Sequence, residues 1–263
     1  MATAKRAPSG ALFAFSRHPM LRCAQTGLPG FCHTSIDMRP AFDPESLPIV
    51  STDIRHPPLA EVRLRPDFIR HRLQSPPAWA PELTDESRVY DRGLALRDAA
   101  VLVPLVERED GLTVLLTERN ANLSSHAGQI SFPGGRHEAF DIDRVATALR
   151  ETEEEVGLVR DYVEVLGALP DYITGTGFHV SPVVGLVRDG FTLRPDAREV
   201  ADVFEVPLGF LMDPSHHQRR LFRWVDGERM FYAMPFPRED GGHRFIWGAT
   251  AGMLRNLYHL LAA

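Results

Sequence analysis

Four glutamates crowd into five consecutive positions of the stretch RETEEEVG, which covers residues 150–157. On a helix, Glu151 lies one turn away from both Glu154 and Glu155, so these three carboxylates share one edge. Glu153 points away from that edge and is expected to be solvated. Like charges at this spacing repel each other. Two explanations are open at this point: a solvated acidic face, or a set of carboxylates that surrounds a divalent cation.

An apolar stripe runs beside this acidic edge on the helix predicted for residues 143–156. Its members recur at helical spacing: Val145, Ala148, Leu149, Thr152 and Val156. Asp143 is a plausible N-cap, and Gly157 stands where a left-handed residue ends a helix. Because the stripe packs on the core, the carboxylates are expected at its rim, where buried charge needs a compensating cation. Carboxylate oxygens favour Mg²⁺ or Mn²⁺, and Arg150 is expected to fork one carboxylate and hold it in place.

The loop ahead of the helix favours the cation site. FPGGR places Gly134 and Gly135 just upstream of the acidic residues. Glycines allow the backbone to approach closely, so the Gly135 carbonyl can serve as a further ligand. A plain turn is the alternative. A Gly-Gly turn followed by a helix with R-E-x-x-E-E-x-G is nevertheless a long pattern to arise by chance.

The combined pattern resembles the box of the Nudix hydrolase superfamily. The second half of the box is matched by six residues: Arg150, Glu151, Glu154, Glu155, Gly157 and Leu158. The first half is offset, because the acidic position after Gly135 holds Asp141 and one extra residue follows. This longer spacing is similar to that of the coenzyme A pyrophosphatase branch, which also has a signature ahead of the box: Leu-Leu-Thr-x-Arg, a spacer, then His-x-Gly-Gln and Phe-Pro-Gly-Gly. The stretch LLTERNANLSSHAGQISFPGG at residues 115–135 matches it at Leu115, Leu116, Thr117, Arg119, His126, Gly128, Gln129, Phe132, Pro133, Gly134 and Gly135. The resemblance covers roughly residues 95–261.

The resemblance implies metal-dependent hydrolysis of the diphosphate of coenzyme A or its derivatives, which gives 3′,5′-ADP and 4′-phosphopantetheine. The Mg²⁺ or Mn²⁺ ligands that it implies are Glu151, Glu154, Glu155 and the Gly135 carbonyl. Arg150 would position one of them. The proton of the attacking water would be taken with the help of Glu154, or by Glu199 in the loop REVADVF, which is otherwise a plain loop acid.

Arg119 and His126 lie in the stretch that precedes the box and are expected to contact the phosphates of the substrate. Arg119 can also simply end a strand. Asn120 and Ser124 depart from the branch, which usually has a small residue and a basic residue there. A missing cation in this loop would weaken recognition of the 3′-phosphate of coenzyme A. The rival substrates are ADP-ribose, NADH and nucleoside triphosphates. A Nudix-fold nucleotide sensor without catalysis is disfavoured because the three box carboxylates are present.

The composition of the chain limits the kinds of partner that it is expected to bind. The 263 residues carry a net charge of −6, which argues against nucleic acid as the main partner. No apolar run approaches the ~20 residues needed to cross a bilayer. The only two cysteines, Cys23 and Cys32, form no metal-binding pattern, so a cytoplasmic location fits best. A homodimer is compatible with the sequence, but no feature fixes the oligomeric state. His216 and His217 are expected at the surface.

The chain divides into three parts. Residues 1–45 are predicted to be a disordered or wrongly started tail; they are acid-free as far as residue 36, a composition that organelle transit peptides share. Residues 46–94 read as a proline-rich extension that packs on the core, with one helix candidate at 66–75. Residues 95–263 form the Nudix domain, with strands predicted at 99–108, 112–120, 163–170, 178–187 and 201–206 and a closing helix at 250–261. The expected fold class is α/β: a Nudix-type α/β/α sandwich with a mixed sheet.

Overall fold

The computed structural model describes residues 43–82, 95–121, 128–224 and 227–263. Its strands are β1 (Ile49–Thr52), β2 (Arg97–Arg108), β3 (Gly111–Arg119), β4 (Ile130–Ser131), β5 (Gly134–Arg136), β6 (Val163–Ala168), β7 (Tyr172–Ile173), β8 (Phe178–Val187), β9 (Val200–Pro207), β10 (Gln218–Trp224), β11 (Gly227–Pro237) and β12 (His243–Trp247). Its α-helices are α1 (Pro66–Gln74), α3 (Arg144–Val156), α4 (Leu208–Leu211) and α5 (Ala249–Ala262), and three 3-10 turns are η1 (Glu61–Leu64), η2 (Arg160–Tyr162) and η3 (Pro214–His216).

An eight-stranded mixed sheet forms the centre of the molecule. Its main path runs β4-β3-β2-β8-β6, and β5, β7 and β9 pair with β2, β8 and β3. Strands β2 and β8 are parallel, while the other pairs are antiparallel. The strands predicted at 99–108 and 112–120 are confirmed as β2 and β3, which form an antiparallel hairpin. Their apolar runs are buried because helices cover the sheet on both faces.

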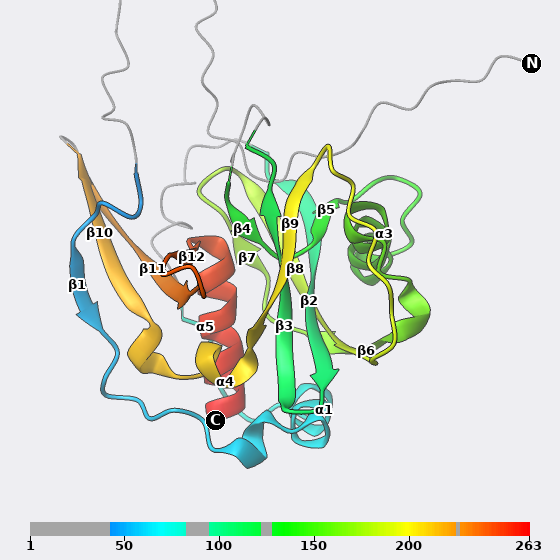
Figure 1. Cartoon of the computed structure of the whole chain (residues 1–263), viewed down its shortest axis with the longest axis horizontal. Helices are drawn as coiled ribbons and strands as arrows, with labels where there is room; N and C mark the ends of the chain where they lie inside the picture. The colour runs from blue at the N-terminus through cyan, green and yellow to red at the C-terminus, as the bar shows by residue number, and fades with distance from the viewer. Residues whose placement is uncertain (1–42, 83–94, 122–127, 225–226) are drawn as a thin grey trace, which may run out of the picture.

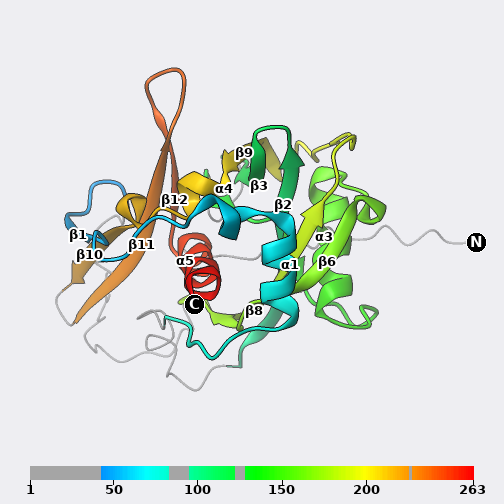
Figure 2. The same ribbon diagram turned by 90° about the horizontal axis from the view of Figure 1, so that it is seen from below.

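The two faces of the sheet have separate cores. Side chains alternate along a strand, so β2 sends Ala99, Val101, Val103 and Leu105 toward one cluster and Ala100, Leu102 and Val106 toward the other. The first cluster includes apolar residues of α5, and the second includes those of α3. Figures 1 and 2 show α3 and α5 on opposite sides of the sheet. The α/β/α sandwich with a mixed sheet is therefore confirmed.

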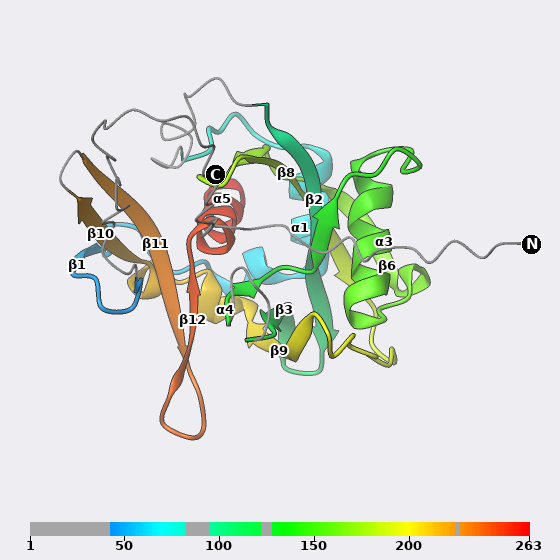
Figure 3. The same cartoon turned by 90° about the horizontal axis from the view of Figure 1, so that it is seen from above.

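A second sheet, which the sequence patterns did not predict, lies on the far side of α5 (Figure 3). Its four strands follow the order β1-β10-β11-β12, so a strand of the N-terminal extension forms one edge. Strand β10, with the sequence QRRLFRW, was not predicted because its arginines interrupt the alternation of apolar and polar residues. Arg220 is nevertheless buried, and its guanidinium donates to the Leu47 carbonyl oxygen at 3.0 Å. An arginine that the sequence pattern suggests is exposed thus joins the N-terminal extension to this sheet.

A buried polar network joins the extension to the C-terminal helix. The Arg255 guanidinium on α5 donates to Asp53, to Glu82 (Nε to Oε2, 3.1 Å) and to His217 (Nη1 to Nδ1, 3.1 Å). Arg255 and Asp53 are both buried. Such a network stabilises the fold only while every member is paired. If one partner is lost, a buried charge remains that neither a partner nor water stabilises.

Arg255→Met is therefore expected to lower the free energy of unfolding by about 3–5 kcal/mol, since the buried carboxylate of Asp53 loses its guanidinium partner and keeps only His56 and the Arg55 amide among the described residues. Urea titration followed by circular dichroism measures this loss. Arg223→Met is the matched control, because Arg223 forms an exposed pair with Glu228 and should cost at most about 1 kcal/mol. Equal losses in the two variants would show that the Arg255 network contributes no more than a surface pair.

His217 corrects the expectation of two surface histidines. It is fully buried, and burial lowers its pKa to about 4. Its Nε2 lies 2.8 Å from the Leu211 carbonyl oxygen, which can only accept, while Nδ1 faces the donor Nη1 of Arg255. The ring is therefore neutral with its proton on Nε2. His216 is partly exposed and stacks on Phe210 with ring centroids 3.9 Å apart.

None of the helices in the described ranges combines the length and the apolar character needed to cross a bilayer. The division of the chain into tail, extension and domain at residues 45 and 94 stays a prediction, since residues 1–42 and 83–94 lie outside the described part.

Candidate active site

Helix α3 begins and ends where its capping residues predict. The Asp143 carboxylate accepts a hydrogen bond from the Ala146 amide at 2.7 Å. Gly157 has a φ of 72°, the left-handed conformation that ends a helix. Between them, Ala148, Thr152 and Val156 are buried against the sheet. This packing fixes which edge of α3 carries each carboxylate.

Two buried carboxylates of this helix contact Gly134 and Gly135, which lie in strand β5 and not in the plain turn that the sequence left open. The Gly134 amide donates to Glu155 Oε2 at 3.0 Å. A Cβ atom on Gly135 would lie only 2.1 Å from the Glu151 carboxyl carbon, so glycine alone leaves room for that side chain. Glu151 is 3% exposed and Glu155 is 7% exposed. Strand β5 and the acidic residues of α3 therefore pack directly on each other.

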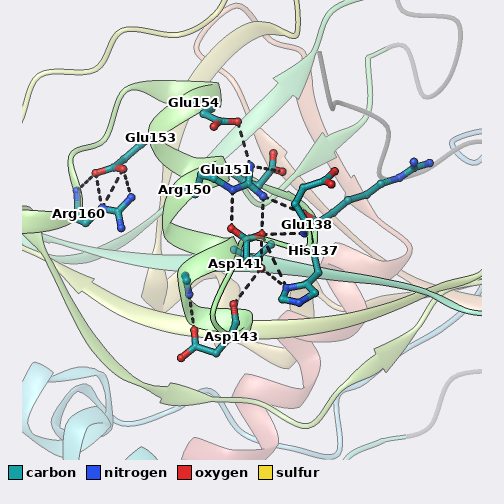
Figure 4. A network of polar contacts seen from close by, with 12 residues as sticks. His137, Glu138, Asp141, Asp143, Arg150, Glu151, Glu153, Glu154 and Arg160 are labelled. Atoms are coloured by element: carbon teal, nitrogen blue, oxygen red, sulfur yellow. Dashed lines mark hydrogen bonds and ion pairs between the residues drawn. The ribbon is translucent and has the colours of Figure 1, made fainter. Parts of the chain in front are cut away.

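Arg150 lies at the centre of the polar contacts (Figure 4). Its Nε and Nη2 donate to the two oxygens of Asp141, both at 2.9 Å. Its Nη1 donates to Glu151 at 2.8 Å and to Glu154 at 3.1 Å. The sequence predicted that Arg150 holds one carboxylate, and the structure has it hold three. Asp141 was missed as its main partner, although an acid at the offset box position was visible; the Arg150 charge lowers the pKa of Asp141.

Glu154 and Glu153 differ from their buried neighbours. The Glu154 side chain is 52% exposed and touches the Arg150 guanidinium. Glu153 points away from that group (Figure 4), as expected. It is not merely solvated, however, because its carboxylate accepts from the Arg160 amide at 2.8 Å and from Arg160 Nε at 3.0 Å. Glu153 therefore fastens the segment that follows α3 and takes no part in the carboxylate group.

The loop that carries Glu199 is held from two sides. Its Asp196 amide donates to the Glu155 carbonyl oxygen at 2.9 Å. On the other side, the Asn120 amide donates to the Glu199 carbonyl oxygen at 2.9 Å, and the Asn120 side chain donates to the Ala197 carbonyl oxygen at 2.8 Å. The pairing of β3 with β9 also shifts register at Arg119, and such irregularities commonly lie beside active sites. The sequence alone could not show that this loop lies near α3.

The pKa values of the two buried glutamates are raised, and each responds to the charges of neighbouring acids. Burial raises the pKa of Glu155 to about 8, and the charges of Glu151 and Glu199 raise it further against the opposing effect of Arg119. Burial raises the pKa of Glu151 to about 7, where Arg150 opposes the shift and the charges of Glu154 and Glu199 add to it. Burial is the largest cause of both shifts, so these two carboxylates are costly to ionise without a compensating positive charge. Such a site favours a cation.

Arg119 ends β3 and lies beside the buried acids. Its side chain is buried, and Nη1 lies 4.0 Å from Glu155 Oε1. Among the described residues, its Nε has no hydrogen-bond acceptor. A buried donor without an acceptor is costly, which suits a group that meets an anionic ligand. His126 and Ser124 lie outside the described residues, and the predicted substrate contacts of Arg119 and His126 stay predictions.

The donor set suits a hard divalent cation. Carboxylate oxygens of Glu151, Glu154 and Glu155 and the carbonyl of Gly135 are the ligand types that Mg²⁺ and Mn²⁺ prefer. Within residues 43–82, 95–121, 128–224 and 227–263, no three His, Cys, Asp or Glu side chains already converge as a metal cluster. The Arg150 guanidinium instead donates to an oxygen of Glu151 and to an oxygen of Glu154. The metal ligands therefore stay a prediction.

The raised pKa values predict a loss of stability with rising pH in the metal-free protein. In the folded state Glu155 retains its proton up to a pKa of about 8, whereas the unfolded chain has released it near 4.5. The folded state then binds more protons, so its stability falls as pH rises. We expect a drop of about 1 kcal/mol per pH unit, or about 2–4 °C in Tm, between pH 6.5 and 8. That window lies above the ordinary pKa of His217, which acts in the opposite direction.

Differential scanning fluorimetry in a chelator measures this slope in the wild type and in Glu155→Gln. Glutamine has no titratable group, so the fall of Tm with rising pH should be clearly smaller in the variant. An identical pH dependence in both proteins would mean that Glu155 is ionised in the fold at neutral pH.

Comparison with known proteins identifies the family. Residues 96–239 match the NUDIX domain. The chain is 42% identical over 172 residues to the protein named "Uncharacterized Nudix hydrolase NudL" from Citrobacter koseri, across 65% of this chain and 85% of that one. It is 39% identical over 179 residues to the protein of the same name from Salmonella newport, across 67% of this chain and 86% of that one.

A solved structure, the NUDIX domain of Shewanella oneidensis NrtR complexed with ADP ribose, is 22% identical with a TM-score of 0.35, across 47% of this chain and 82% of that one. Nudix hydrolases generally use divalent metals such as Mg²⁺ or Mn²⁺ and hydrolyse diphosphate bonds in nucleoside diphosphate derivatives. The matched domain covers more than half of the residues and contains the acidic helix and the two glycines of β5, so the chain belongs to the Nudix family and is a Nudix hydrolase.

Proposed function

We propose that this Nudix hydrolase cleaves the diphosphate of coenzyme A or its derivatives and releases 3′,5′-ADP and a 4′-phosphopantetheine moiety. The observation that carries the reaction type is the pair of buried carboxylates, Glu151 and Glu155, which pack on Gly134 and Gly135 of β5. The substrate rests on the signature in residues 115–135, which resembles that of coenzyme A pyrophosphatases.

In this proposal Glu151, Glu154, Glu155 and the Gly135 carbonyl hold the Mg²⁺ or Mn²⁺. The bound ion supplies positive charge to the diphosphate and lowers the pKa of coordinated water. Arg150 keeps the Glu151 carboxylate oriented through a bond of 2.8 Å. Glu154, which is half-exposed, is placed to receive a proton through the solvent side of the site.

Glu199 is the second candidate base. Its charge is felt by both Glu151 and Glu155, and its loop is fastened to β3 and to α3. Arg119 supports substrate binding from the other side, because its buried Nε lacks an acceptor within the described residues. A phosphate oxygen would satisfy that donor. No nucleic-acid or membrane partner is part of the proposal.

A competition assay tests the substrate. Coenzyme A, ADP-ribose and NADH are supplied at equal concentrations with Mg²⁺, and each product is quantified by chromatography. Coenzyme A should be consumed fastest, and Glu154→Gln should slow the release of every product by roughly 10²–10³-fold, which rules out a contaminating enzyme. Faster consumption of ADP-ribose or NADH would assign the chain to another Nudix activity.

The departure at Ser124 is the observation that favours this second candidate. Without a basic residue there, recognition of the 3′-phosphate needs another cation. A nucleotide sensor without turnover is the remaining alternative. It conflicts with the retention of all three box carboxylates.

A further inference from the structure

Two arginines share one aromatic ring at the end of the sheet where β5 pairs with β2. Phe178 begins β8, pairs with Arg97 of β2 and is fully buried. The Arg97 guanidinium carbon lies 4.0 Å from the centre of the Phe178 ring. The guanidinium carbon of Arg136, the last residue of β5, lies 5.8 Å from the same centre. Cations favour the face of an aromatic ring, so Phe178 brings two positive charges together.

Arg136 has a buried donor without a partner in the described part of the chain. Its Nε is buried and has no hydrogen-bond acceptor there. Arg97 is exposed and donates through Nη2 to the Thr176 carbonyl oxygen at 3.0 Å. A buried guanidinium donor without an acceptor, beside a second guanidinium over the same ring, favours an anion.

The position of this pair connects it to the carboxylate site. Arg136 directly follows Gly135, and its carbonyl oxygen accepts from Arg150 Nη2 at 3.1 Å. Successive residues of a strand face opposite sides of the sheet. Gly135 faces Glu151 on the α3 side, whereas Phe178 belongs to the core on the α5 side. Glu151 and the Arg136 side chain therefore lie on opposite sides of the short strand β5.

We infer that Arg97 and Arg136, stacked on Phe178, bind a phosphomonoester on the ribose of the nucleotide substrate. This inference rests on the proposed function and assigns the recognition of the 3′-phosphate of coenzyme A. A phosphomonoester carries up to two negative charges, and guanidinium groups bind it through paired, charge-assisted hydrogen bonds. The pair supplies the cation that the loop position of Ser124 lacks.

Isothermal titration calorimetry with two matched ligands tests the site. Adenosine 3′,5′-bisphosphate and adenosine 5′-monophosphate differ only in the 3′-phosphate, and both are titrated into the wild type, Arg136→Gln and Arg97→Gln in the presence of Mg²⁺. The wild type should bind the bisphosphate roughly 10–100-fold more tightly than the monophosphate. Arg136→Gln should remove most of this preference and leave the affinity for the monophosphate unchanged.

Arg108→Gln is the control, because Arg108 lies at the other end of β2, stacks over Phe191 at 5.2 Å and pairs with Glu205. This variant should retain the preference for the bisphosphate. Thermal melts of every variant separate a lost contact from a lost fold.

No preference in the wild type, or equal weakening of both ligands in Arg136→Gln at an unchanged Tm, would overturn the inference. The binding assay does not depend on hydrolysis. A preserved preference for the bisphosphate with no turnover of coenzyme A would thus refute the proposed substrate and support the phosphate site. Hydrolysis of coenzyme A without a preference for the bisphosphate would support the proposed substrate and refute the phosphate site.

Discussion

Glu154→Gln is expected to lower kcat by roughly 10²–10³-fold, because it removes one charged group from the centre that stabilises the reacting diphosphate. The side chain is 52% exposed and touches Arg150, so its packing contribution is small. The Tm should therefore stay close to that of the wild type. Steady-state kinetics with coenzyme A and a thermal melt measure the two quantities.

Glu153→Gln is the control one residue away on the same helix. Its carboxylate pairs with Arg160 on the side of α3 that faces away from the group, so kcat should be unchanged. Full activity in Glu154→Gln, or equal losses in the two variants, would show that the acidic edge of α3 is not catalytic.

Gly135→Ala is expected to lower kcat/KM by at least roughly 100-fold. The added methyl group would lie 2.1–2.5 Å from the three carboxyl atoms of Glu151, so that carboxylate has to move. A displacement of about 1 Å at a reacting centre is enough for a loss of this size. The effect should appear as a lost response to Mg²⁺ in the kinetic assay.

Gly209→Ala is the matched control, because its methyl group would meet only Leu64 at 3.6 Å, an ordinary contact. It should retain activity and stability. Wild-type kinetics in Gly135→Ala would mean that the position of Glu151 is not important for turnover.

Local sequence signals predicted the helix that carries the chemistry. The Asp143 cap, the apolar stripe and the left-handed Gly157 act within a few residues of one another, so α3 was predictable from residue 143 to its end. The strands β2, β3 and β8 were predictable for the same reason, since their apolar runs lie between turn residues.

Long-range contacts escaped prediction. No local pattern indicates that Arg150 would take both oxygens of Asp141. The approach of the Glu199 loop depends on the pairing of β3 with β9 and on Asn120. His217 reads as polar in sequence and is buried because Arg255, on a distant helix, supplies its partner. In each case the partner lies far along the chain or across a turn that sequence spacing does not fix.

Binding of Mn²⁺, followed by the loss of the free-ion signal in electron paramagnetic resonance, tests most directly whether the acids of α3 share a divalent cation. The metal-free wild type should take up Mn²⁺, and Glu155→Gln should bind it at least roughly tenfold more weakly, since a buried ligand is lost. Equal Mn²⁺ affinity in the two proteins, or no uptake by the wild type at millimolar Mn²⁺, would contradict the account.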